Sequence, residues 1–263
     1  MSKNRLLEVY ELTREFKTRI DGRRTNYIKA VDDVSFELES GESLGITGRS
    51  GSGKTTLVRL ITGVLPPNYG RILYSGIDMF RCSVEERKRI RRKLGVVYQD
   101  PVTSVDPRMQ IADIIAEPLV HHLQMKGNNL EKRIGALFDS VELSRLYSLR
   151  YPHQLSIGEL QRVCIARALA LEPELVLFDE ATSAIDSINQ QKLVDLILAL
   201  RAKFALSYIY VSHNLALLAV ICDSILVMER GRIVERGRLA EVLRNPSHRS
   251  TQELVESIPR FPM

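Results

Sequence analysis

The chain has 263 residues, of which 44% are hydrophobic and 26% are charged, and its three cysteines show no short spacing. This composition is typical of a globular protein with one large α/β domain or a core carrying a small insert, and it argues against a disulfide framework or a zinc cluster. The net charge of +5 alone would fit nucleic acid or an anionic membrane surface. However, the densest basic run, 87–93, contains no aromatic residues, so we expect a solvated helix face and no nucleic-acid partner.

The apolar stretches of the chain are too short to span a bilayer, and the N-terminal residues lead into an alternating pattern rather than an apolar signal core. We therefore expect a soluble protein from a reducing compartment. Any role at a membrane is expected to come through a partner.

Alternating residues at 6–10 and 31–38 predict two strands, and a short apolar strand at 43–47 runs into Gly48. From Lys54 the apolar residues recur at helical spacing until Pro66 ends the pattern. Further short strands are expected near 71–74 and at 94–98.

The middle of the chain, 105–172, has a mostly helical pattern. The breaks expected within it are prolines and a Gly-Asn turn, at Pro107, Pro118, 127–129 and Pro152. The later elements are expected to be a buried strand at 175–178, a helix at 189–203, a strand at 207–211 and a hairpin around 229–232. Strands that alternate with helices, together with a helical insert, predict a three-layer α/β core with a helical subdomain.

The segment 48–55 fits the pattern G-x-x-x-x-G-K-[ST] between a predicted strand and a predicted helix. Glycines let backbone N–H groups point at a phosphate, and the start of the helix adds its positive end. Lys54 is expected to reach the outer phosphates, and the Thr55 hydroxyl is a candidate Mg²⁺ ligand. ATP and Mg²⁺ are the expected ligands, and the nucleotide-binding residues of this segment are Gly48, Arg49, Ser50, Gly51, Ser52, Gly53, Lys54, Thr55 and Thr56.

Polar side chains follow three of the predicted strands, where ligands bind in α/β sheets. Asp179 is suited to hold Mg²⁺ through its water shell, and Glu180 is suited to polarise the attacking water. Gln99 and His213 follow the strands 94–98 and 207–211. We predict Glu180, His213 and Gln99 as catalytic residues, and Thr55, Gln99 and Asp179 as metal ligands.

These motifs stand in a fixed order with Leu-Ser-Ile-Gly-Glu at 155–159 and the helix-like segment after it. The order resembles that of the ATP-binding cassette (ABC) family over nearly the whole chain, and 183–186 resembles the D-loop of that family. The resemblance implies an α/β, ABC-type P-loop ATPase core, with a mostly parallel sheet, an antiparallel β subdomain and an inserted α-helical subdomain. It also implies one ATPase domain over 1–263, divided into a core of 1–98 and 173–240, a helical subdomain of about 99–172 and a tail of 241–263.

The resemblance further implies a head-to-tail dimer of ATPase subunits, in which Ser156, Gly158 and Glu159 face the nucleotide of the partner. ATP would close the dimer and hydrolysis would open it. The segment after Gln99 would pass this motion to membrane-spanning permease subunits at the cytoplasmic face of the membrane, which work with an external substrate-binding protein.

Residues 98–109 and the tail 245–259 are similar to peptide and nickel importer ATPases, which leaves oligopeptide, dipeptide, nickel and metal–chelator cargo open. No cysteine follows Cys222, so no iron–sulfur centre is expected. Two residues depart from the usual signature Leu-Ser-Gly-Gly-Gln, because Ile157 replaces a glycine and Glu159 replaces the glutamine. We hypothesise that Ile157 weakens this composite site, which is tolerable if the second ATPase is a different chain.

Tyr27 lies nearest to the place where the family stacks an aromatic residue on adenine, and Phe16 is the alternative.

Two other functions are possible for such a chain. One is a soluble ABC-type ATPase that acts on nucleic acid or ribosomes, against which the single phosphate loop and the absence of a long insertion argue. The other is a cassette that binds ATP without turnover, against which Glu180 and His213 argue.

Overall fold

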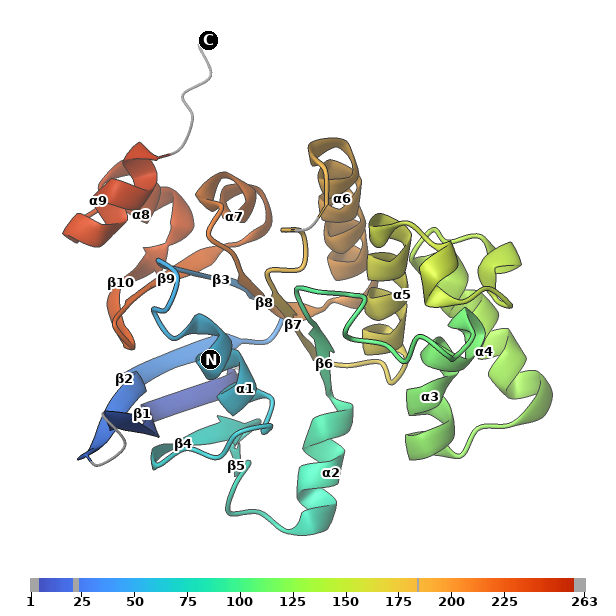
Figure 1. Cartoon of the computed structure of the whole chain (residues 1–263), viewed down its shortest axis with the longest axis horizontal. Coiled ribbons are helices and arrows are strands. Elements are labelled where there is room, and N and C mark those ends of the chain that lie inside the picture. The colour runs from blue at the N-terminus through green and yellow to red at the C-terminus, as the bar shows by residue number, and fades with distance from the viewer. Residues whose placement is uncertain (1–4, 21–23, 184, 258–263) are drawn as a thin grey trace. The chain divides into compact units, whose positions relative to one another are not determined.

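A computed structural model describes residues 5–20, 24–183 and 185–257 of the chain. Its residues form two compact units, one of 1–91 with 208–263 and the other of 92–207 (Figure 1). The chain therefore leaves the first unit once and returns to it.

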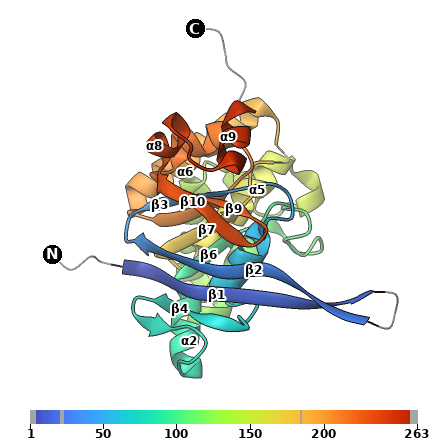
Figure 2. The ribbon, with the colours of Figure 1, turned by 90° about the vertical axis from the view of Figure 1, so that its left-hand side faces the viewer.

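The first unit contains an antiparallel sheet with the strand order β2-β1-β4-β5. Figure 2 shows β1 and β2 as a long hairpin. These two strands extend well beyond the predicted strands 6–10 and 31–38. The prediction was too short because bulges near Glu11 and Asp33, which both have positive φ, interrupt the side-chain alternation on which it relied. The strands are β1 (Arg5–Ile20), β2 (Arg24–Glu39), β4 (Tyr69–Tyr74) and β5 (Ile77–Asp78).

A second group of strands in this unit runs in the order β10-β9-β3-β8. The strand β3 (Ser43–Thr47) pairs in parallel with both β8 (Ser207–Val211) and β9 (Ser224–Glu229), and β10 (Arg232–Arg238) returns antiparallel to β9. Every residue of β3 and β8 is buried, as expected of parallel strands covered on both faces. The helices of the unit are α1 (Lys54–Ile61), α2 (Val84–Arg92), α7 (Leu215–Ile221), α8 (Leu239–Arg244) and α9 (Arg249–Glu256).

The second unit combines the parallel strands β6 (Leu94–Val97) and β7 (Leu175–Asp179) with helices. The helices α3, α4 and α5 pack on one another around buried apolar residues such as Ile115, Phe138 and Val163. The helical elements are α3 (Ile111–Leu123), α4 (Gly127–Ser140), η1 (Arg145–Tyr147), η2 (Pro152–Gln154), α5 (Ile157–Leu169) and α6 (Ser187–Phe204).

Two predicted helix breaks are wrong. Pro118 lies inside α3, where the burial of Ile114, Ile115 and Leu119 outweighs a proline cost of about 3 kcal/mol. The other break, expected at 127–129, instead falls just before Gly127. Gln124 ends α3 in the left-handed conformation with φ 52, and α4 begins at Gly127.

The predicted strands 43–47 and 207–211 and the hairpin around 229–232 are confirmed. The basic run 87–93 lies largely on α2, where only Ile90 is buried.

No helix in the described ranges is both long enough and apolar enough to cross a bilayer.

Candidate nucleotide site

The loop between β3 and α1 takes a course that only glycine follows without strain. Gly48, Gly51 and Gly53 all have positive φ, at 147°, 76° and 104°. A Cβ atom on Gly53 would lie 2.1 Å from the Ala30 carbonyl oxygen, and one on Gly48 would lie 2.2 Å from that of Met228. The strands β2 and β9 therefore press against the loop backbone and fix its shape.

The loop presents hydrogen-bond donors suited to an anion. The Lys54 ammonium donates to the carbonyl oxygens of Gly48 at 2.8 Å and Arg49 at 3.1 Å, so its charge is held inside the curve of the loop. Gly53 caps α1 without a side-chain hydrogen bond, which leaves the positive helix end for a ligand. The buried Ser52 hydroxyl has no hydrogen-bond partner among the described residues. These features fit a polyphosphate.

The hairpin between β9 and β10 supports the loop from outside. The Gly231 N–H donates to the Ser52 carbonyl at 3.0 Å, and the Asp32 N–H donates to the Gly231 carbonyl at 2.8 Å. Asp32 also pairs with Lys29 at 2.9 Å and with Arg232 at 2.6 Å. Hydrogen bonds from Lys29 and then Arg232 lower the pKa of the Asp32 carboxyl, so this support stays charged at neutral pH.

His213 and the phosphate loop share one edge of the sheet in the first unit. β8 pairs in parallel with β3, with Val211 opposite Ile46, so both strands end on the same side. The exposed His213 follows β8 there. The tail helix α9 also reaches the loop, because Glu253 pairs with Arg49 at 2.8 Å.

The second unit brings Gln99, Asp179 and Glu180 to one edge in the same way, because β6 and β7 are parallel with Val97 opposite Phe178. Asp179 is the last residue of β7 and is only 5% exposed. Glu180 has φ 50, a left-handed conformation that costs a non-glycine residue free energy and is frequent at functional sites. The Ser183 N–H and hydroxyl both donate to its carbonyl at 3.0 Å and hold this turn.

The signature segment is organised by side chains. Ser156 caps α5, and the Glu159 carboxylate accepts from the Ser156 N–H at 2.8 Å and from its hydroxyl at 2.7 Å. The Tyr147 hydroxyl donates to the other carboxylate oxygen at 2.8 Å. Burial raises the pKa of Glu159, but the bonds from Ser156 and Tyr147 outweigh it, and the net pKa is lowered. The segment therefore carries a fixed negative charge beside Ser156.

A hollow of about 170 Å³ lies beside this cap, lined by Gly158 and by Asn189 of α6 among others. Ile157 is 46% exposed, so its side chain faces outward rather than filling the core. Asp186 caps α6 by accepting from the Asn189 N–H at 3.0 Å. Of the predicted D-loop, Ala184 lies outside the described residues.

A family model described as "ABC transporter" matches residues 31–183, which span the phosphate loop, the signature, and Asp179 and Glu180 at the end of β7. The chain belongs to the ABC transporter family.

Named relatives agree with this assignment. The ABC chain is 40% identical over 258 residues to the oligopeptide transport ATP-binding protein OppD of Mycobacterium bovis, covering 97% of this chain and 41% of the relative. It is 38% identical to the oligopeptide transport ATP-binding protein OppF of Haemophilus influenzae, covering 98% of this chain and 79% of the relative. The chain thus spans only about two fifths of the length of the mycobacterial relative.

Among solved structures, the ABC chain is similar to the dimeric ATP-binding cassette MJ0796 in a post-hydrolysis state bound to ADP and Pi. The TM-score is 0.79 at 28% sequence identity, and the match covers 89% of this chain and 98% of the other. The predicted ABC-type α/β fold is confirmed.

The adenine-stacking residue of this ABC chain stays a prediction. Lys17 pairs with Tyr27 and Phe16 pairs with Ile28, so the two candidate aromatics occupy adjacent cross-strand pairs of one hairpin. Tyr27 is 59% exposed and Phe16 is 36% exposed, and Arg14 lies over the Phe16 ring at 5.1 Å.

Two residues that organise the signature segment were not among the predicted site residues. Tyr147 holds Glu159 from 12 residues away, and no local pattern marks that contact. Gln161 is fully buried and donates to the Tyr98 carbonyl at 3.3 Å, which ties α5 to the residue before Gln99. A polar residue among the apolar positions of α5 was the available signal for Gln161.

Proposed function

We propose that the chain binds and hydrolyses ATP as the peripheral, cytoplasmic ATPase subunit of an ABC importer for peptides. The observation that carries the proposal is the glycine loop with the Lys54 ammonium held inside it. The names of relatives support the cargo, since they denote oligopeptide, dipeptide and glutathione transport. Nickel or a metal–chelator complex stays a prediction from residues 98–109 and the tail 245–259.

The predicted phosphate-binding and catalytic residues each have a role in this proposal. The loop 48–53 and the first N–H groups of α1, with Thr56, bind the phosphates, and Lys54 neutralises the outer ones. Glu180 orients and polarises the attacking water, and His213 and Gln99 contact the reacting phosphate or the water. These groups stabilise charge that develops as the terminal phosphoryl group leaves.

Oxygen ligands of Thr55, Asp179 and Gln99 suit Mg²⁺, which prefers hydroxyl, carboxylate and amide oxygens together with phosphates. No cluster of three or more His, Cys, Asp and Glu side chains suited to a metal occurs among the described residues. When bound, Mg²⁺ would neutralise charge on the phosphate oxygens.

The proposal includes a head-to-tail dimer with a second ATPase chain, and permease subunits as the coupled partners. Ser156 and Gly158 would face the partner's nucleotide. Ile157 is exposed and Glu159 is charged, which supports an imperfect composite site at that proposed face and hence a different partner chain. Domain limits of 1–98 and 173–240 for the core and about 99–172 for the helical part stay a prediction.

The test is Glu180→Gln, which keeps the size of the side chain and removes its ability to accept a proton. ATP affinity should stay within about threefold of wild type, while the hydrolysis rate should fall at least about 100-fold. Glu11→Gln is the matched control, because Glu11 is also a glutamate with positive φ, at 47°. Unchanged hydrolysis in Glu180→Gln, or strong stimulation of hydrolysis by DNA or RNA, would contradict the proposal.

A further inference from the structure

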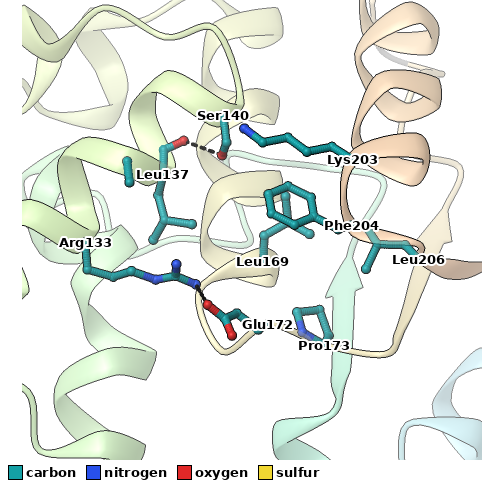
Figure 3. Close-up of a pocket in the computed structure, with 10 residues that line it drawn as sticks. Arg133, Leu137, Ser140, Leu169, Glu172, Pro173, Lys203, Phe204 and Leu206 are labelled. Atoms are coloured by element: carbon teal, nitrogen blue, oxygen red, sulfur yellow. Dashed lines mark hydrogen bonds and ion pairs between the residues drawn. The ribbon is translucent and has the colours of Figure 1, made fainter.

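A cavity of about 440 Å³ opens within the second unit, away from the predicted nucleotide residues of that unit. It lies between α4, the C-terminal end of α5, the segment that enters β7, and the C-terminal end of α6 (Figure 3). Its volume falls within the range of roughly 300–1,000 Å³ that is typical of small-molecule pockets.

The wall of this cavity is largely apolar. Leu137, Leu169 and Leu206 line it and are themselves at most 7% exposed, so they form a firm surface rather than loose side chains. Phe204 also lines it and is 44% exposed, which leaves part of an aromatic ring open to a ligand. A ligand with an apolar body would remove this ring from water.

The two cations at the cavity differ in how far they are engaged. Arg133 pairs with Glu172 at 2.9 Å and donates to the Ala170 carbonyl at 3.2 Å, as Figure 3 shows for the ion pair. Lys203 makes no ion pair with any described residue, and its ammonium lies 5.2 Å from the centre of the Phe204 ring.

Hydrogen bonds from Arg145 are the main cause of the lowered pKa of the Asp139 carboxyl, and the Lys203 charge is a weaker cause. Within the described ranges, no carboxylate forms an ion pair with Lys203, so its positive charge at the apolar cavity is open to an anionic ligand.

We propose that this cavity binds a small amphipathic carboxylate, with its apolar body on the leucine wall and Phe204 and its carboxylate at Lys203. Charge complementarity selects the ligand: a neutral molecule would gain only the apolar contacts, and a cation would be repelled. The site does not depend on the proposed ATPase function.

The position of the cavity separates it from the predicted catalytic residues of the same unit. Its lining residues Glu172 and Pro173 precede β7, whereas Asp179 is the last residue of that strand, which is about 13 Å long at roughly 3.3 Å per residue. The cavity touches α5 at Leu169, whereas Ser156 caps the other end of that helix. The carboxylate should therefore bind whether or not ATP is present.

The experiment is calorimetric titration of the full chain with decanoate, decanol and decyltrimethylammonium, each below its micelle concentration. Decanoate should bind most tightly and the ammonium compound most weakly. Lys203→Met should weaken decanoate about two- to fivefold, the range for a solvent-exposed ion pair, and leave decanol unchanged. Lys203→Glu should reverse the preference between the two charged compounds.

Two further variants give the controls. Lys132→Met removes the same charge from an exposed position of α4 outside the cavity lining and should leave all three affinities unchanged. Ala136→Phe places a ring in the cavity from an exposed helical position, so it should fold normally and reduce binding of both decanoate and decanol. Equal affinity for decanoate and decanol, or undiminished decanoate binding in Ala136→Phe, would overturn the proposal.

Discussion

The phosphate loop and the signature segment are the two parts of the chain that we propose to contact nucleotides, and they are built by different means. Backbone atoms shape the loop, whose glycines lie against the carbonyl groups of Ala30 and Met228. Side chains shape the signature segment, where Ser156, Glu159 and Tyr147 form a chain of hydrogen bonds.

The difference predicts how each region responds to substitution. A backbone cradle fails when a single Cβ atom is added, because the clashing carbonyl belongs to a packed strand. A substitution in a side-chain network alters the charge of the network and the strength of its hydrogen bonds, while the helix that it caps remains in place. The loop should therefore be intolerant of change, and the signature segment should be adjustable.

The largest effect is expected from Gly53→Ala. Its Cβ would lie 2.1 Å from the Ala30 carbonyl oxygen at a φ of 104°, so clash and strain together should cost about 3 kcal/mol or more in the free energy of unfolding. Gly51→Ala is the matched variant, because φ is 76° but no atom lies within 4 Å of the added Cβ. It should cost only about 1–2 kcal/mol. Urea unfolding measures both, and equal costs would show that strain alone, without packing, restricts the loop.

This contrast also explains what the sequence could predict. The loop was predicted residue by residue, because its glycines and lysine must occupy a short contiguous pattern between a strand and a helix. The strand ends that carry Asp179, Glu180 and His213 followed from apolar runs that stop at polar residues.

Contacts between residues that are distant in the chain could not be predicted from local sequence patterns. Nothing local indicates that Tyr147 holds Glu159, or that Pro118 is tolerated in α3 because its neighbours are buried. The strands β1 and β2 were predicted too short for a related reason. The bulge at Glu11 changes which face of the strand is buried, so the alternating pattern does not continue past it.

The next largest effect concerns the tail beside the loop. Glu235 of β10 accepts hydrogen bonds from the Ser247 N–H and hydroxyl and from the His248 N–H, at 2.7, 2.8 and 3.0 Å. Burial raises the pKa of this carboxyl, but the bonds from Ser247 and His248 outweigh it, and the pKa is lowered to about 2. Glu235→Gln should cost about 2 kcal/mol and expose α9 to hydrogen exchange, while the loop keeps its protection.

The pH dependence of this contact has a definite sign. Since the folded pKa is lowered from 4.5 to about 2, the stabilisation is complete above about pH 4.5 and is lost as the pH falls toward 2. The difference in unfolding free energy between wild type and Glu235→Gln should shrink over that window. If this free-energy difference stayed constant from pH 6 to pH 3, protonation of Glu235 would not be coupled to unfolding.

A smaller effect tests whether the signature segment is adjustable. Glu159→Gln keeps an oxygen that can accept from Ser156 but removes the negative charge at the face proposed to meet the partner's phosphate. In the assembled transporter, ATPase activity at low ATP should rise about two- to fivefold, as removal of about 0.5–1 kcal/mol of repulsion would give. Tyr147→Phe removes a hydrogen bond and retains the charge, so it should produce no such rise. An unchanged rate in Glu159→Gln would show that the charge is not felt by the nucleotide.

The smallest effect is expected where a side chain touches the loop. Glu253 of α9 pairs with Arg49 at 2.8 Å and with Arg249 at 2.9 Å, and Arg49 itself is largely exposed. Water screens such a pair, so Glu253→Gln should change the unfolding free energy by less than about 0.5 kcal/mol and ATP affinity by less than twofold. Glu256→Gln, an exposed glutamate of the same helix, is the control. If Glu253→Gln alone changed ATP affinity tenfold, the loop would depend on a tail side chain as well as on its backbone, and the contrast with the signature segment would fail.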